Sequence, residues 1–259
     1  GEKGVILWTD QDLASITKAP TVQVVRPPSK GLVYYSDCRL DEKINQAVQR
    51  TLLSCCNGHT LVSVTLKPMD FGRNIVLSLE RGRLTMFKQI LAGLEALDTD
   101  IAFLCEHDLL YARDHFDFTP PQKEAYFYNQ HTWRVDAKTG QALFYYCKQV
   151  SGLCAHRDLL VEHYRKRVER VERDGYDHAM GYEPGCHAPP RGIDNYPAEV
   201  WWSERPNVDI RHRHNLTASR WTQSEFRDLR TCQGWTMADA VPGWGVTKGR
   251  FSAFLAELH

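Results

Sequence analysis

The amino-acid sequence predicts an α/β fold, with a mostly parallel central sheet, flanking helices and an irregular C-terminal region. Three apolar segments, 31–36, 60–66 and 101–105, alternate with two segments of helical periodicity. Strands that alternate with helices at this spacing form parallel sheets with crossover connections. After Gly175 the chain is rich in Gly, Pro, Trp and His and loses its periodicity. Long irregular segments of this kind often carry substrate-binding residues.

Two helices are predicted between the three strands. Asp41 precedes apolar residues that recur four positions apart over 44–52, so we expect it to cap the first helix. A second apolar stripe over 86–97 predicts another helix, and 69–74 before it is predicted to be a loop. A short strand is also expected over 22–25, ahead of a proline-containing linker.

The second half of the chain has fewer regular elements. Segments 125–135 and 141–146 flank a turn-like sequence, Asp136-Ala137-Lys138-Thr139-Gly140, and are predicted to form a hairpin. A strongly amphipathic helix is expected over 156–173, and a short one near the C-terminus. We therefore expect an extension over 1–30 and a single domain over 31–259, divided into halves at 31–118 and 119–259.

Composition narrows the class of protein. The 32 basic and 32 acidic side chains cancel, so no overall positive field favours a nucleic-acid partner, although a local basic face remains compatible with one. No apolar run approaches the roughly 20 residues of a membrane span. The eight cysteines are dispersed without a C-x-x-C pair, which predicts free thiols and a cytoplasmic location.

The acidic triplet Glu106-His107-Asp108 follows the third predicted strand directly. Open α/β sheets bind ligands at the carboxyl ends of their strands, and residues two apart on an extended segment point the same way. Two carboxylates on the same side of the strand end predict a site for Mg²⁺ or Mn²⁺. The remaining ligands of this ion are expected to be diphosphate oxygens. The alternative is a solvated acidic turn at the end of a strand.

A second polar segment, Asp209 to Asn215, alternates charged residues with histidines. As a strand it places His212 and His214 on one side. A neutral imidazole here is a candidate nitrogen ligand for the same ion, and Arg211 and Arg213 are candidate phosphate partners. The alternative is a basic strand edge whose histidines are hydrogen-bonded or exposed.

The run from Arg81 to Tyr111 with Phe116-Asp117-Phe118, the motif Tyr182-Glu183-Pro184-Gly185 and the run from Asn207 to Thr217 carry a resemblance to a known family. Over residues 31–221 the chain resembles the Rossmann-like GT-A glycosyltransferases. In particular it resembles the base J and hydroxymethyl-pyrimidine DNA glucosyltransferases of kinetoplastids and phages.

This resemblance implies an enzyme that moves a sugar, by default glucose, from a UDP-sugar to a hydroxyl group with the help of Mn²⁺ or Mg²⁺. The implied acceptor is a 5-hydroxymethyl pyrimidine in DNA, and the implied location is the host cytoplasm if a phage encodes the chain. No membrane partner is implied.

The resemblance also implies roles for individual residues. Glu106-His107-Asp108 stands where the family has its D-x-D motif, with Asp108 the main metal ligand and Glu106 at a position that departs from Asp. His212 stands where the family has a histidine that binds metal or diphosphate. The remaining donor-binding candidates are Tyr35, Ser36 and Asp37 for the nucleoside, Arg73 and Arg83 for the diphosphate or nucleobase, and His107. The alternatives are a turn cap for Asp37 and surface roles for the arginines.

Transfer to a hydroxyl group with inversion needs a general base. Glu183, in a rigid and partly apolar turn, is the first candidate, because such a setting raises a carboxyl pKa. Asp194 is the second. Either side chain is also compatible with a structural role.

Three other functions fit parts of the sequence. The same chemistry on a saccharide or protein acceptor is the closest alternative. A non-catalytic nucleic-acid-binding protein would use the arginines and tryptophans of the second half, including Arg205, Arg220 and Trp221. A metallohydrolase would use His212, His214 and the carboxylates. The strand-helix-strand beginning and the carboxylate pair favour sugar transfer.

Overall fold

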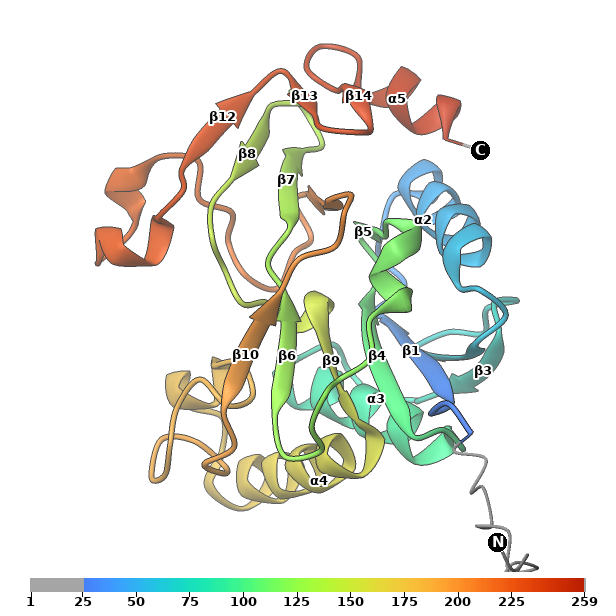
Figure 1. Ribbon diagram of the computed structural model, residues 1–259, viewed down its shortest axis with the longest axis vertical. Helices are drawn as coiled ribbons and strands as arrows, with labels where there is room; N and C mark the ends of the chain where they lie inside the picture. Colours follow the sequence, from blue (N-terminus) through green and yellow to red (C-terminus); the bar gives the residue numbers. More distant parts are fainter. Residues whose placement is uncertain (1–25, 259) are drawn as a thin grey trace, which may run out of the picture.

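The computed structural model describes residues 26–258, so the strand expected over 22–25 lies outside the described residues. Its central feature is a seven-stranded sheet in the order β10-β6-β9-β4-β1-β2-β3 (Figure 1). β3, β2, β1 and β4 are parallel, and β9 runs antiparallel to both of its neighbours, β4 and β6. The bounds are β1 (Lys30–Ser36), β2 (Thr60–Thr65), β3 (Arg73–Val76), β4 (Ile101–Glu106), β6 (Tyr126–Asn129), β9 (Leu153–His156) and β10 (Ala198–Trp201).

Helices cover both faces of this sheet, which confirms the α/β prediction. Alternate residues of β1 enter two separate cores. Leu32 packs in the core that contains α2 (Glu42–Cys55), and Val33 packs in the core that contains α3 (Arg83–Ala96) and α4 (Arg157–Asp174). Asp41 caps α2 as predicted, because its side chain accepts the backbone N–H of Lys43.

A second sheet, in the order β12-β8-β7-β11-β5, continues from the first. Its strands are β5 (Leu109–Leu110), β7 (Thr132–Asp136), β8 (Ala142–Phe144), β11 (Asn207–Arg211) and β12 (Thr236–Ala238). β7 and β8 form the predicted hairpin. The smaller elements are η1 (Arg113–Asp117), η2 (Val150–Gly152), η3 (His178–Gly181), η4 (Gln223–Glu225), η5 (Leu229–Cys232), β13 (Ala240–Val241), β14 (Gly245–Val246) and α5 (Phe251–Glu257).

Two expectations about strands were wrong. Segment 125–135 is not one strand, because a turn at 130–131 sends β6 into the first sheet and β7 into the second. In this turn the Asn129 side chain accepts the backbone N–H of His131, and Thr132 donates to the carbonyl of Gln130. The segment 69–74, predicted to be a loop, contains the beginning of edge strand β3, which pairs with β2 at Val62.

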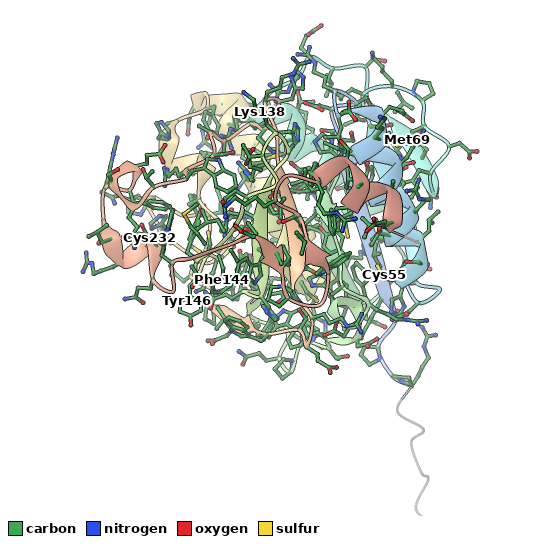
Figure 2. All side chains as sticks on the ribbon, turned by 90° about the horizontal axis from the view of Figure 1, so that it is seen from above. Cys55, Met69, Lys138, Phe144, Tyr146 and Cys232 are labelled. Atoms are coloured by element: carbon green, nitrogen blue, oxygen red, sulfur yellow. The ribbon has the colours of Figure 1, made fainter. Side chains whose placement is uncertain are left out.

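The eight cysteines are free, as the sequence predicted. Cys55 on α2 and Cys232 in η5 lie far apart, as Figure 2 shows. Among the described helices, none is both long and apolar enough to cross a membrane.

The two sheets are joined directly at the acidic triplet. β4 ends at Glu106, the chain turns through His107 and Asp108, and β5 follows as the edge strand of the second sheet. β5 pairs with β11 in antiparallel register, with Leu109 opposite Asp209, and the Ile210 N–H donates to the Asp108 carbonyl at 2.8 Å. This pairing brings the residues that follow β11 beside the triplet.

Candidate functional site

A cavity of about 310 Å³ lies where the two sheets meet. Its walls come from the ends of β1 and β4, the beginning of α3, the side of α4, and residues 145–150, 181–183 and 209–221. Most of the predicted site residues line it, namely Tyr35, Ser36, Asp37, Arg83, Glu106, His107, Asp108 and Glu183. The parallel strands therefore bring their carboxyl ends together at this cavity, as the sequence predicts.

Three predicted residues do not line this cavity. Arg73 begins the edge strand β3 and is exposed, and its guanidinium donates to the Ala96 carbonyl at 3.1 Å. Asp194 accepts hydrogen bonds from Tyr126 and His163, each at 2.7 Å, in a largely buried group beside α4. His212 contacts Asp108, which lines this cavity, but the His212 side chain itself lines a second cavity.

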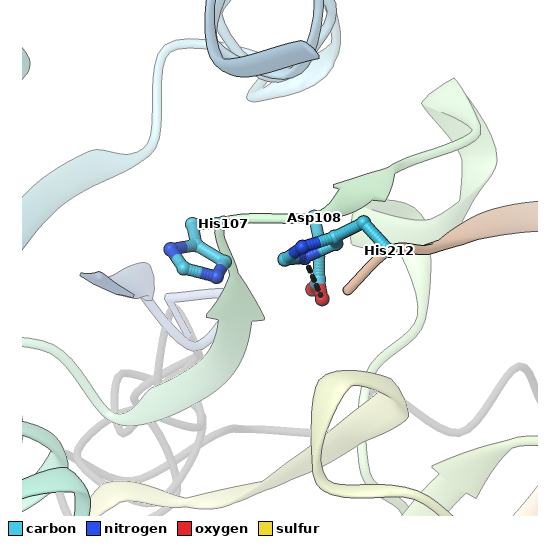
Figure 3. A group of neighbouring side chains, drawn as sticks. All are labelled: His107, Asp108 and His212. Carbon is cyan, nitrogen blue, oxygen red and sulfur yellow. Dashed lines mark hydrogen bonds and ion pairs between the residues drawn. The ribbon is translucent and has the colours of Figure 1, made fainter. Parts of the chain in front are cut away.

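His107, Asp108 and His212 form a compact cluster (Figure 3). One potential ligand atom from each residue lies within 4.8 Å of the others. His212 Nε2 lies 3.3 Å from Asp108 Oδ2, and Asn215 Nδ2 donates to the same oxygen at 2.5 Å. Burial by itself raises the pKa of Asp108, but the hydrogen bond with His212 and the surrounding positive charges outweigh it, so the pKa is lowered. Asp108 is therefore a carboxylate.

His107 joins this cluster to the first strand. Its Nδ1 lies 2.7 Å from the Ser36 hydroxyl and 3.7 Å from Asp37 Oδ1. Burial lowers the pKa of His107, although the neighbouring aspartates oppose the shift, and the ring is neutral near pH 7. A neutral imidazole held from one side by hydrogen-bonding partners is the usual form of a histidine that binds a metal.

The cluster fits a divalent transition-metal ion. Two donors that each lie about 2.0–2.2 Å from a metal are at most about 4.4 Å apart, so ligand atoms within 4.8 Å need to close by only a few tenths of an ångström. Imidazole nitrogens suit transition-metal ions such as Zn²⁺ or Fe²⁺, whereas Ca²⁺ and Mg²⁺ prefer oxygen ligands. Of the two ions expected from the sequence, Mn²⁺ is the better match.

Glu106 does not belong to this cluster. The expectation that it would share an ion with Asp108 assumed an extended chain, and the turn at His107 and Asp108 breaks that alternation. Burial, together with the negative charges of Asp108 and Asp209, raises the pKa of Glu106 to about 8. Glu106 therefore holds a proton at neutral pH in this structure. The middle residue of the triplet, His107, takes its place in the cluster.

Two arginines at the beginning of α3 connect it to the segment that follows β11. Arg81 binds Asp37 Oδ2 at 2.5 Å and also donates to the His214 carbonyl. Arg83 donates to the Leu216 carbonyl and to the Thr217 hydroxyl, each at 3.1 Å. No described side chain caps the first turn of α3, whose N-cap is Gly82. Residues of this turn and both arginines line the cavity. The N-terminal end of a helix favours an anion beside it.

Three further residues line the cavity but were not predicted to be site residues, namely Arg81, Asn215 and Arg167. Arg81 and Asn215 lie within motifs that carry the family resemblance, two residues from Arg83 and one residue from His214. Arg167 lies on α4 three residues after Tyr164 and four before Val171, so helical spacing places it on the buried face of this helix. Because arginines are seldom buried, this position was not predicted to be a site residue.

A second cavity, of about 990 Å³, lies behind the segment 211–221. Its other walls are the beginning of α2, the β7–β8 turn and α5, and that segment lines both cavities. Basic side chains that line it are Arg39, Lys43, Lys138 (labelled in Figure 2), Arg211 and Arg213. Two acidic side chains, Asp41 and Asp136, also line it. Because Arg211 is paired with Asp209, four other basic side chains face these two acidic ones, and the wall presents net positive charge.

No family model and no curated protein matches the sequence. Solved structures with a similar arrangement include a glycosyltransferase involved in glycosylation of the major capsid of PBCV-1, 11% identical over 70% of this chain and 92% of that chain, with a TM-score of 0.44. The galactosyltransferase LgtC, with donor and acceptor sugar analogues, is 12% identical over 88% and 96% (TM-score 0.41). A Drosophila galactosyltransferase 7 complex with manganese, UDP-Gal and xylobiose is 14% identical over 76% and 78% (TM-score 0.39). The likeness is weak and concerns architecture only.

Proposed function

We propose that this chain is a metal-dependent glycosyltransferase of the GT-A type, which moves a sugar, glucose by default, from a UDP-sugar to a hydroxyl acceptor. One observation carries the proposal. Two members of the cluster with His212, namely His107 and Asp108, line the same cavity as the uncapped first turn of α3. A cation site beside an anion-binding helix end matches a nucleoside diphosphate with its metal ion.

The bound ion would neutralise the diphosphate as the sugar leaves. The protein's own part is to orient the donor. The Arg81 guanidinium, fixed by Asp37, and the first turn of α3 would hold phosphate oxygens, since both offer N–H donors at the cavity edge. Ser36 and Asp37, at the end of β1, would border the nucleoside. Arg83 would act mainly by holding Leu216 and Thr217 as a wall of the donor cavity.

Glu183 is the proposed general base. It lines the cavity, and burial raises its pKa to about 7, although the positive charge of Arg167 opposes the shift. A carboxyl group with a pKa near the working pH is well suited to accept a proton from a hydroxyl group. Asp194 is less suited to this role, because it lies outside the cavity lining and already binds Tyr126 and His163.

For the acceptor, we propose a 5-hydroxymethyl pyrimidine in DNA. The support is the basic wall of the second cavity, which shares the segment 211–221 with the donor cavity. Phosphates bound there would bring a nucleotide close to the donor, and a base flipped out of the duplex can enter a narrow active site. A saccharide or protein acceptor remains the competing proposal, for which the basic wall has no evident use.

The donor half is tested by titrating the protein with UDP in the presence of Mn²⁺ in a calorimeter. We expect binding by the wild-type protein and at least a tenfold loss in Asp108→Asn, because removal of a charged metal ligand weakens the site. Asp98→Asn, at an exposed position outside the cavity, is the matched control. Failure of the wild-type protein to bind UDP would overturn the proposal.

The acceptor half is tested with UDP-glucose that carries a radioactive label. The protein is incubated with hydroxymethylated duplex DNA, with unmodified DNA of the same sequence, and with a set of saccharides. Label on hydroxymethylated DNA alone is the expected result. Label on a saccharide, with none on DNA at several salt concentrations, would instead favour the competing acceptor.

A further inference from the structure

Arg167 is a buried cation with unused hydrogen-bonding capacity. It lies on α4, lines the donor cavity, and has a relative exposure of 2%. Its Nε and Nη2 atoms are buried and have no hydrogen-bond partner among the described residues. Buried polar groups are nearly always hydrogen-bonded, because leaving them unpaired is costly. Two unpaired donors on one guanidinium at a cavity wall are therefore suited to a ligand that completes their hydrogen bonds.

Aromatic rings hold this guanidinium in place. Its Cζ lies 4.6 Å from the centre of the Tyr182 ring, 5.0 Å from that of Phe87 and 5.6 Å from that of Tyr164. These cation–π contacts support the positive charge without using its N–H groups. The donors of Arg167 are thus fixed in position and remain available, which is the arrangement expected of a preformed binding group.

Two more idle polar atoms belong to the same cavity. The hydroxyl groups of Tyr35 and Tyr182 are buried and have no partner among the described residues, and both side chains line the cavity with Arg167. Tyr35 comes from the end of β1 and Tyr182 from the segment after η3. Polar atoms from β1, α4 and the segment after η3 therefore line one cavity without a hydrogen-bond partner among the described residues.

The chemistry of the neighbours limits the ligand. Glu183 is next to Tyr182 in the chain, and its charge and that of Arg167 influence each other, yet the two side chains form no direct ion pair within the described structure. A ligand phosphate or carboxylate would suit Arg167 but would meet repulsion from Glu183. A hydroxyl group donates and accepts at once, so it can bind a guanidinium and a carboxylate together. Aromatic rings beside it suit the apolar face of a sugar ring.

The geometry points to a buried sub-site for a neutral sugar, in which Arg167, Tyr35 and Tyr182 bind ring hydroxyl groups and Glu183 faces the same ring. The inference rests on the proposed function and assigns this ring to the sugar of the UDP-sugar donor. Arg167 is then a specificity-determining residue, which makes the protein selective for a hydroxylated, uncharged hexose.

The test compares the affinity for UDP-glucose with the affinity for UDP, both with Mn²⁺. In Arg167→Met we expect the affinity for UDP-glucose relative to UDP to fall about tenfold or more, because hydrogen bonds to a charged group are lost. The affinity for UDP itself should stay within about twofold of the wild-type value. Arg165→Met is the matched control, since Arg165 lies on the same helix but is exposed and paired with Glu95.

A second arm uses wild-type protein only, so it does not depend on the folding of a variant. UDP-glucose analogues that each lack one hydroxyl group are titrated, and at least one should bind about tenfold more weakly, because a site built around a hydroxyl rejects its absence. The same analogue should show no such loss in Arg167→Met or Arg167→Lys if Arg167 is the partner.

The outcomes separate the two proposals. Equal affinities for all deoxy analogues, or an unchanged ratio of UDP-glucose to UDP in a folded Arg167→Met, would overturn the sub-site and leave the proposed function standing. No UDP binding by the wild-type protein would overturn the proposed function, and the donor-sugar assignment with it. Tighter binding of a UDP-uronic acid than of UDP-glucose would also overturn the assignment of a neutral sugar.

Discussion

His212 Nε2 lies 3.3 Å from Asp108 Oδ2, although 104 positions separate the two residues in the chain. Their meeting depends on β11, which pairs with β5 directly after the turn that contains Asp108. The candidate metal site therefore lies where the two sheets meet. A substitution that weakens the pairing of β5 with β11 should weaken the whole site.

Metal binding should stabilise the folded protein. We expect Mn²⁺ at about 100 times its dissociation constant to raise the melting temperature by about 5–10 °C, because a ligand of the folded state alone adds about 2.7 kcal/mol at that concentration. His107→Ala or His212→Ala should remove most of this shift, whereas Glu106→Gln should keep it. Differential scanning fluorimetry measures the shift, with exposed His178→Ala as the control. A Glu106→Gln variant that no longer responds to Mn²⁺ would return Glu106 to the ligand set.

Glu183 should make stability depend on pH. The folded protein keeps the proton of Glu183 up to about pH 7, whereas an ordinary glutamate releases it near pH 4.5. Between these values the folded state binds more protons than the unfolded state, so the contribution of Glu183 to the free energy of unfolding falls as pH rises. Glu183→Gln should therefore gain stability relative to wild type between pH 5 and pH 8. Unfolding in urea at both pH values measures the difference, and a gap that stays constant would contradict the prediction.

The ionisation of Glu183 should also make the transfer rate depend on pH, and this rate should rise with pH, whereas the stability contribution falls. As a general base Glu183 acts in its ionised form, so the transfer rate should rise with pH through about 7. Glu183→Gln should lower kcat by a factor of about 100 to 10,000, the usual contribution of such a group, without an equal change in UDP affinity. Kinetics from pH 5.5 to 8.5 provide the measurement. An unaltered profile in Glu183→Gln would assign the base to another residue.

The wall formed by residues 214–217 should depend on Arg83. Its guanidinium holds both the Leu216 carbonyl and the Thr217 hydroxyl. We expect Arg83→Gln to increase the rate of amide hydrogen exchange in 214–219 about tenfold, since these contacts tie the segment to α3. Arg50→Gln, at an exposed position on α2 outside both cavities, is the control. Unchanged exchange in 214–219 would mean that the segment is held by other contacts, such as that of Arg81.

Local patterns were sufficient to predict much of the fold. Asp41 as a cap, the buried stripe of α2 and the apolar runs of β1, β2 and β4 are properties of short stretches, and the structure confirms them. The pairing of β5 with β11 was not predictable, because a two-residue strand has no periodicity and its partner lies about 100 residues away.

The same limit applies to the candidate site, because its geometry depends on contacts between distant parts of the chain. The sequence located Asp108 and His212 in separate motifs, but only the turn after β4 decides whether Glu106 or His107 faces them. Helical spacing places Arg167 on the same face of α4 as Tyr164 and Val171, but long basic side chains at such positions usually extend their charge to solvent, so its full burial was not predicted. Side-chain direction after a strand ends, and burial of a charge on a polar helix, are set by tertiary packing.

The basic wall of the second cavity should bind DNA in a salt-dependent way. Lys43 at the beginning of α2 and Lys138 in the β7–β8 turn are both exposed and line this wall. Because each neutralised phosphate releases counterions, replacing one lysine with glutamine should weaken binding to any duplex sequence and reduce the slope of log K against log salt by about one. UDP affinity should not change, since neither lysine lines the donor cavity. Fluorescence anisotropy at 50 to 200 mM salt measures the slope, with the exposed Lys123→Gln as the control. If Lys43→Gln and Lys138→Gln match the wild-type slope while DNA still binds, the acceptor strand follows another surface.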